Sequence, residues 1–219
     1  KRILAIILCV SLIFSLNTVS AATVSSECDI SDIAVPIDST VTDTAIGTKL
    51  DIKAKSAILM EVNTGEILYE MNADEKLPPA SITKIMSLLL VMEAISAGKM
   101  SVEDVVAASE HACSMGGSQI WLEPNEEMTV NDLLKATAIG SANDAATLLG
   151  EYISGSEEAF INLMNERAKE LGMNNTHFEN ATGLDDTTDT HLTTARDIGI
   201  MSVELMKHDL ITDYTTVWM

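Results

Sequence analysis

The chain has 219 residues, of which 47% are hydrophobic and 21% are charged, and this is enough material for one domain with a sizeable core. The formal net charge is -20 and only 13 residues are lysine or arginine, which excludes a surface built to bind nucleic acid. Any anionic substrate must be held by a local cation, because the overall field of such an acidic protein repels it.

The chain begins like a secretory leader. Lys1 and Arg2 form a basic start, residues 3–14 are apolar, and small residues at 19–21 precede Ala22 as a cleavage site. Because the apolar run is too short to span a bilayer comfortably, we predict that residues 1–22 are a removed signal peptide and that the protein is exported.

Residues 23–54 are rich in Ser, Thr, Asp and Val without a sustained period, which predicts a flexible lead to a folded region at 55–219. Two strand-like runs follow, at 57–62 and 66–71, on either side of Asn63-Thr64-Gly65. This pattern predicts a β-hairpin with a three-residue turn, packed on the helix that follows it.

The next helix is predicted at residues 82–95, after two prolines and a serine, and Gly98 is expected to end it. Ser81 and Lys84 are three residues apart, so they project from the same side of a helix. A serine hydroxyl becomes a good nucleophile when a neighbour takes its proton, and a lysine can do so only when it is neutral. Burial and the positive end of a helix both favour the neutral amine.

We therefore predict Ser81 as a catalytic nucleophile, with Lys84 as its base and the Ser81 backbone N–H as half of an oxyanion hole. The alternative is an N-cap serine followed by a surface lysine. The segment from Ser96 to Lys99 has the same spacing, and we interpret it as the C-terminus of the helix without chemistry.

Residues 99–129 show a short, irregular pattern that predicts loops, with His111 and Cys113 among them. A lone histidine in a loop is usually solvated, and we expect Trp121 to pack in the interior rather than to stack on a ligand. Cys28 and Cys113 could pair outside the cell, but their spacing does not require a disulfide. The cysteines and histidines show no metal-ligand spacing, so no metal is predicted.

A second polar box lies between two helical runs, at 130–139 and 145–153, with Gly140 as the expected break. Ser141 and Asn143 stand in this box, Ser141-Ala142-Asn143-Asp144. A serine and an amide at such a corner can point into a shared cleft, where Ser141 would relay a proton and Asn143 would hold a substrate amide. The alternative is a helix cap.

Further helices are predicted at 156–171, with an N-cap serine and a glycine stop, and at 198–207, after a capping box at 194–197. The helices within 130–171 should form an all-α lobe opposite the sheet. The cleft should lie between the two, with the loop at 177–186 along its border.

The stretches Pro79-Ala80-Ser81-Ile82-Thr83-Lys84 and Ser141-Ala142-Asn143-Asp144-Ala145 resemble the first two motifs of the penicillin-binding serine D-Ala-D-Ala carboxypeptidases. The resemblance covers roughly residues 55–219. Further stretches resemble the same family: Gly65-Glu66-Ile67-Leu68-Tyr69, His177-Phe178-Glu179-Asn180-Ala181-Thr182-Gly183-Leu184 and His191-Leu192-Thr193-Thr194-Ala195-Arg196-Asp197.

This resemblance implies an α/β fold, in detail α+β, of the β-lactamase and DD-peptidase type, with an antiparallel sheet packed with helices and an all-α lobe. It implies that Ser81 attacks the bond between the two terminal D-alanines of a peptidoglycan pentapeptide. Lys84 would be the base, Ser141 and Asn143 would assist, and no cofactor is implied. β-Lactam antibiotics, which mimic the dipeptide, would acylate Ser81 as inhibitors. The expected location is the cell wall or the outer face of the cytoplasmic membrane.

The third motif of this family, Lys-Thr-Gly on a strand, is absent from the 219 residues. We therefore expect the motif and the later strands to lie beyond Met219, where a further segment could associate with the membrane surface. Two alternatives remain, a β-lactamase or esterase of the same fold and a non-catalytic domain that binds β-lactams or the wall. Glu170 and Asn174 have a β-lactamase-like spacing, which we interpret as chance because Glu170 falls in the last turn of a helix.

Overall fold

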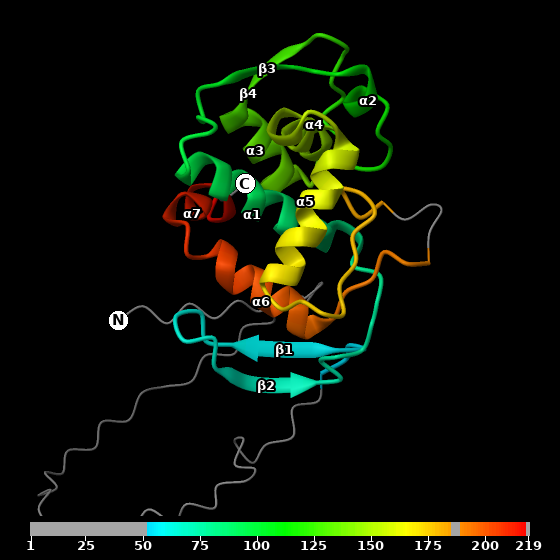
Figure 1. Ribbon diagram of the computed structural model, residues 1–219, viewed down its shortest axis with the longest axis vertical. Helices are drawn as coiled ribbons and strands as arrows, with labels where there is room; N and C mark the ends of the chain where they lie inside the picture. Colours follow the sequence, from blue (N-terminus) through cyan, green and yellow to red (C-terminus); the bar gives the residue numbers. More distant parts are fainter. Residues whose placement is uncertain (1–51, 185–188, 218–219) are drawn as a thin grey trace, which may run out of the picture. The chain divides into compact units, whose positions relative to one another are not determined.

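The computed structural model describes residues 52–184 and 189–217, which form helices and two small antiparallel sheets (Figure 1). The predicted signal peptide and nearly all of the predicted lead lie outside the described residues. The elements are β1 (Ala57–Met60), β2 (Ile67–Met71), η1 (Ala80–Thr83), α1 (Lys84–Ser96), β3 (Val105–Ala107), α2 (Glu110–Cys113), β4 (Glu127–Thr129), α3 (Val130–Gly140), α4 (Asn143–Ser154), α5 (Glu157–Glu170), α6 (Ala195–Leu205), η2 (Asp209–Ile211) and α7 (Thr212–Thr215).

The predicted hairpin is present, and β1 pairs with β2 in antiparallel register. Its connection spans residues 61–66, longer than the three-residue turn that we expected, because Glu61 organises the loop. The Glu61 carboxylate accepts the backbone N–H of Asn63 at 2.9 Å and that of Thr64 at 2.6 Å. Hydrogen bonds from Thr64 and Asn63 lower the pKa of Glu61 to about 2. The carboxylate thus adds to the backbone hydrogen bonds that close this loop, from Glu61 N–H to Glu66 O at 2.8 Å and from Gly65 N–H to Glu61 O at 2.9 Å.

The hairpin packs on α6, so the expectation that it would pack on the helix after Ser81 is wrong (Figure 1). Helix α6 in turn contacts α1. Gly199 allows the close approach of α6 to β1, because a Cβ at this position would lie 2.4 Å from Met60 Sδ and 3.4 Å from Ile58 Cγ2. The apolar pattern of a sequence does not show which helix will cover a strand, because that depends on how closely each helix can approach it.

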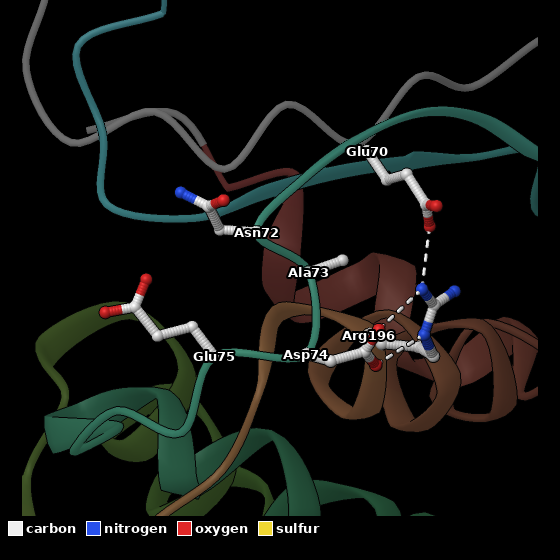
Figure 2. A pocket seen from close by; sticks show the side chains of 6 residues that line it. All are labelled: Glu70, Asn72, Ala73, Asp74, Glu75 and Arg196. Atoms are coloured by element: carbon white, nitrogen blue, oxygen red, sulfur yellow. Dashed lines mark hydrogen bonds and ion pairs between the residues drawn. The ribbon is translucent and has the colours of Figure 1, made fainter.

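Arg196 ties the end of β2 to the start of α6. Its Nε lies 2.7 Å from Asp74 Oδ1 and its Nη2 lies 2.8 Å from Glu70 Oε2. Figure 2 shows the guanidinium turned toward both carboxylates across a shallow polar pocket. The backbone N–H of Arg196 also donates to Ala73 O at 3.0 Å. The first turn of α6 is therefore bound to the hairpin by ion pairs and by a backbone hydrogen bond.

Helix α1 lies at the centre of the helical group and contacts α3, α4, α5 and α6. Its side chains are buried on most sides, as its apolar sequence predicts. The predicted single helix after Ser81 is in fact split, because the chain makes the short 3₁₀ turn η1 before α1 begins at Lys84. Gly98 ends the helix as predicted, with a φ of +67°, and the Lys99 N–H donates to Ala94 O.

The all-α group of α3, α4 and α5 forms as predicted. The break comes one residue later than predicted, because Gly140 is the last residue of α3 and Ser141, with a left-handed φ of 55°, caps the helix. Helices α4 and α5 pack closely because Gly150 has no Cβ, which would lie 2.5 Å from Phe160 Cδ1. Helix α5 starts at the predicted cap, where Ser156 Oγ accepts the N–H of Ala159 at 3.2 Å.

The stretch at 99–129, which we predicted as loops, contains a second antiparallel pair, β3 with β4, and the short helix α2. These three-residue strands are too short for an apolar alternation to be read from sequence. Trp121 does not pack in the interior, because 76% of its surface is exposed. Within the described residues Cys113 forms no disulfide, and Cys28 lies outside them.

Helix α6 begins three residues earlier than the predicted start, and Thr194 caps it by accepting the Asp197 N–H at 3.1 Å. The α+β class, with antiparallel strands and a group of helices, is confirmed. No helix in residues 52–184 and 189–217 is long and apolar enough to cross a membrane.

Candidate active site

Ser81 and Lys84 lie together where η1 passes into α1. The Lys84 amine donates to Ser81 Oγ across 3.2 Å, and it also donates to the backbone oxygen of Thr182 across 2.9 Å. Ser81 is exposed, whereas Lys84 is only 3% exposed. This arrangement presents the hydroxyl to an incoming molecule and keeps the amine behind it, away from water.

Burial lowers the pKa of Lys84 from 10.5 to about 8. The cause is desolvation, since removal of the ammonium from water disfavours its charged form. About one amine in ten is then neutral at pH 7, whereas an ordinary lysine would be neutral less than once in a thousand. The amine can therefore accept the Ser81 proton at ordinary pH.

The oxygen that holds this amine comes from a segment far along the chain. Ala181 lies beside Thr182, and its N–H donates to Glu157 Oε1 at 3.1 Å while its O accepts from Ser87 Oγ at 2.7 Å. The segment is thus attached to both α5 and α1. The predicted position of the 177–186 loop along the site is confirmed for its described part, residues 177–184, through the contact of Thr182 with Lys84.

Gly183 continues this segment against the nucleophile turn. A Cβ at Gly183 would lie 1.7 Å from Ala80 O and 2.7 Å from Thr83 Oγ1. The residue also has a φ of +78°, which other residues rarely adopt. Only glycine therefore lets the Thr182 carbonyl reach the Lys84 amine while the turn keeps its place.

The second box is held at the corner between α3 and α4, and both helices contact α1. Asn143 is 4% exposed, and its Nδ2 donates to Gly116 O at 2.7 Å. Its Oδ1 has no hydrogen-bond partner among the residues that the structure describes, so this oxygen is available to an amide N–H. Within the same residues the Ser141 hydroxyl makes no hydrogen bond, and in particular none to Ser81 or Lys84.

Asp144 is a residue of this box to which the sequence assigned no role. Its side chain is fully buried, and its carboxylate accepts the N–H groups of Ile120 at 3.1 Å, Leu122 at 3.2 Å and Ala145 at 2.9 Å. Asp144 also lies in the first turn of α4, where the helix dipole favours a negative charge. Asp144 thus holds the loop that Asn143 contacts through Gly116. The only sequence signal was an acid directly after Asn143.

The remaining candidates do not join this site. Ser96, in the second serine-lysine copy, ends α1 and pairs with His208 Nδ1 at 3.0 Å, so the interpretation of that copy as a helix end is confirmed. Glu170 pairs with Arg167 at the end of α5. The side chain of His111 is half exposed, as expected, but the residue lies in α2 and not in a loop, and it contacts Glu157 Oε2 at 2.6 Å.

No group of three acidic, histidine or cysteine side chains in residues 52–184 and 189–217 is arranged to hold a metal ion. Three side chains of the site carry groups that can react or bind. Ser81 supplies a nucleophile, Lys84 supplies a base and Asn143 supplies an amide oxygen. The Ser81 N–H lies in the first turn of η1, where no carbonyl of that turn can reach it, so it can donate to an oxyanion.

A family model described as D-alanyl-D-alanine carboxypeptidase matches residues 41–218 of the chain. The D-alanyl-D-alanine carboxypeptidase DacF of Bacillus subtilis (strain 168) is 54% identical over 168 residues, which are 77% of this chain and 43% of the relative. The D-alanyl-D-alanine carboxypeptidase DacC of Escherichia coli (strain K12) is 40% identical over 169 residues, 74% of this chain and 42% of the relative. The chain thus spans less than half the length of these two relatives.

Solved structures show the same fold. The D-alanyl-D-alanine carboxypeptidase DacD from Francisella tularensis is similar with a TM-score of 0.74 and 35% identity, covering 80% of this chain and 42% of that one. Penicillin-binding protein D2 from Listeria monocytogenes in its ampicillin-bound form is similar with a TM-score of 0.68 and 31% identity, covering 78% and 69%. The predicted DD-peptidase-like fold class is therefore confirmed. Since the family model matches most of the 219 residues, the chain belongs to the D-alanyl-D-alanine carboxypeptidase family of peptidases, S11.

Proposed function

We propose that the full-length protein is a serine-type D-Ala-D-Ala carboxypeptidase that removes the terminal D-alanine from peptidoglycan stem peptides through an acyl-enzyme on Ser81. The observation that carries this proposal is the buried Lys84 amine, 3.2 Å from Ser81 Oγ and with a pKa lowered to about 8. The relatives' names and the family match support the same activity.

In the proposed reaction, neutral Lys84 takes the proton from Ser81 as Oγ attacks the carbonyl carbon between the two D-alanines. The neutral amine has a lone pair for this proton, and one of its N–H groups can stay bound to Thr182 O. The tetrahedral intermediate then collapses, the C–N bond breaks, and the terminal D-alanine leaves as an amine that takes a proton from Lys84. Water later hydrolyses the ester on Ser81.

Asn143 would accept the backbone N–H of the substrate peptide through its Oδ1, whose companion Nδ2 is fixed by Gly116 O. The Ser81 N–H would donate to the developing oxyanion. Ser141 would relay a proton to the leaving amine, which requires its hydroxyl to turn toward Lys84. The net charge of -20 makes a local cation necessary for the terminal carboxylate of the substrate.

Export is part of the proposal, because the substrate class lies outside the cytoplasm. The basic start and the apolar run at residues 3–14 support it. With residues 1–22 removed, the exported protein should begin at Thr23 or a neighbouring residue, which N-terminal sequencing of the mature protein can determine.

The test uses the full-length protein with benzylpenicillin and, separately, with a pentapeptide that ends in D-Ala-D-Ala. We expect one penicilloyl adduct by intact-protein mass spectrometry, located on the peptide that contains Ser81, and release of D-alanine from the pentapeptide. The Ser81→Ala variant is the matched control and should show neither. Absence of both signals in the unaltered protein would contradict the proposal.

The same experiment separates the alternatives. An adduct that disappears within seconds while the antibiotic is consumed would indicate a β-lactamase. A lasting adduct without D-alanine release would indicate a protein that only binds or senses β-lactams.

A further inference from the structure

A buried polar pair lies directly behind the nucleophile turn. Thr83, the last residue of η1, has its Oγ1 2.9 Å from Nε2 of His191, which is distant in the sequence. Thr83 is 0% exposed and His191 is 1% exposed. The ring of Phe178 packs edge-on against the imidazole, with centroids 5.8 Å apart and an interplanar angle of 78°. The imidazole is thus held in one orientation.

The second ring nitrogen decides where the proton of this imidazole lies. The backbone N–H of Glu179 donates to His191 Nδ1 at 3.2 Å. An amide nitrogen always carries its hydrogen, so Nδ1 is the acceptor and carries none. Nε2 is therefore the ring nitrogen that carries a hydrogen, and it donates this hydrogen to Thr83 Oγ1.

This bond restrains the turn that carries the nucleophile. The residue before η1 makes no side-chain cap, and Ala80, within the turn, has a strained φ of +47°. On the other side, Gly183 fits against Ala80 O and Thr83 Oγ1. The turn therefore lies between the 182–183 segment and the imidazole. A shift of Thr83 would also move the nucleophile Ser81 and the base Lys84, which are close to it in the chain.

We propose that His191 is a positioning residue for acyl transfer, which through Thr83 keeps Ser81 Oγ within reach of the Lys84 amine. The inference rests on the proposed function, because it concerns the rate of that reaction. His191 does not touch the reacting atoms. Its effect is to fix the turn, and the Nε2–H donor carries this effect, whereas the Nδ1 acceptor only attaches the ring to the backbone.

Two amide variants separate the two ring nitrogens. In His191→Gln the amide nitrogen can occupy the place of Nε2 and donate to Thr83. In His191→Asn the shorter amide oxygen can occupy the place of Nδ1 and accept from Glu179, but it leaves Thr83 without its donor. A purely structural role predicts that both variants lose acylation in proportion to their loss of stability.

Three quantities are measured on the full-length protein. They are the saturating rate constant of acylation by benzylpenicillin, the benzylpenicillin concentration for half-saturation and the melting temperature. We expect His191→Asn to lower the rate constant roughly 10- to 100-fold while half-saturation stays nearly constant, because a small misplacement of reacting groups acts on the chemical step. His191→Gln should stay within about threefold of the unaltered protein, since it keeps the donor.

Thr83→Val and Thr83→Ser provide a second pair in case the histidine variants do not fold. Valine removes the acceptor hydroxyl and should match His191→Asn, whereas serine keeps it and should match the unaltered protein. Equal rates for His191→Gln and His191→Asn, or an unchanged rate for a folded Thr83→Val, would overturn this inference but not the proposed function. No adduct on the unaltered protein would instead overturn the proposed function, and this inference with it.

Discussion

Gly183 lies so close to Ala80 that a Cβ added to the glycine would come within 1.7 Å of the alanine carbonyl oxygen. This contact joins the segment that holds the Lys84 amine to the turn that carries Ser81. Because the atom in the way belongs to the backbone, no side chain can move aside to relieve the clash. The site therefore depends on a residue that carries no functional group.

We expect Gly183→Ala to destabilise the protein and to abolish acylation. Gly172 is the matched control, since its φ of +77° equals that of Gly183 within one degree but no atom lies within 4 Å of an added Cβ. Gly172→Ala should cost about 1–2 kcal/mol from the left-handed backbone alone. Gly183→Ala should cost about 1–3 kcal/mol more, from the clash. Chemical denaturation measures both, and equal costs would show that the turn can move.

The rate of acylation should depend on pH through Lys84. Its pKa is lowered to about 8 by burial, and only the neutral amine can take the Ser81 proton. The rate constant should therefore rise about tenfold per pH unit up to about pH 7.5 and level off above pH 8.5. Stopped-flow acylation between pH 6 and pH 10 tests this. A rate that keeps rising to pH 10 would mean that the amine titrates as an ordinary lysine.

The two serine-lysine copies offer a direct comparison of a buried and an exposed amine. Lys84→Ala should lower the acylation rate constant by roughly 10²- to 10⁴-fold, the usual contribution of a general base. Lys99→Ala should leave it unchanged, because Lys99 is exposed after the end of α1. Both are measured with fluorescent penicillin on gels over time. If Lys84→Ala acylates at the rate of Lys99→Ala, Lys84 is not the base.

Replacement of Asp144 should loosen the loop beside Asn143. Asp144→Asn puts an amide NH₂ where the carboxylate now accepts the N–H groups of Ile120 and Leu122, so at least one buried donor loses its partner. We expect a loss of about 2–3 kcal/mol in the free energy of unfolding. Asp132→Asn is the control, because Asp132 also lies in the first turn of a helix but its side chain is 49% exposed.

Asp132→Asn should cost less than about 1 kcal/mol, as is usual for an exposed cap. Hydrogen exchange should show the backbone amides at 118–122 opening faster only in Asp144→Asn. Similar losses for the two variants would mean that the buried carboxylate contributes no more than a surface charge.

The sequence by itself determined the features that depend on neighbours along the chain. The spacing of Ser81 and Lys84 determines that a helical backbone brings them together, and Thr194 and Ser156 cap their helices through N–H groups three residues away. The hairpin and the five longer helices could be predicted in the same way. The observed helix ends differ from the predicted ones where a 3₁₀ turn or a left-handed residue replaces the expected α-helical start or stop.

Only the tertiary structure decided what lies opposite these local features. Any residue offers a backbone carbonyl, so no sequence pattern marks Thr182 O as the partner of Lys84. The buried Asp144 and His191 were found through donors and acceptors from distant segments, and Trp121 is exposed although its side chain is large and apolar. The pKa of Lys84 belongs to this second class, because desolvation depends on all the atoms packed around the amine.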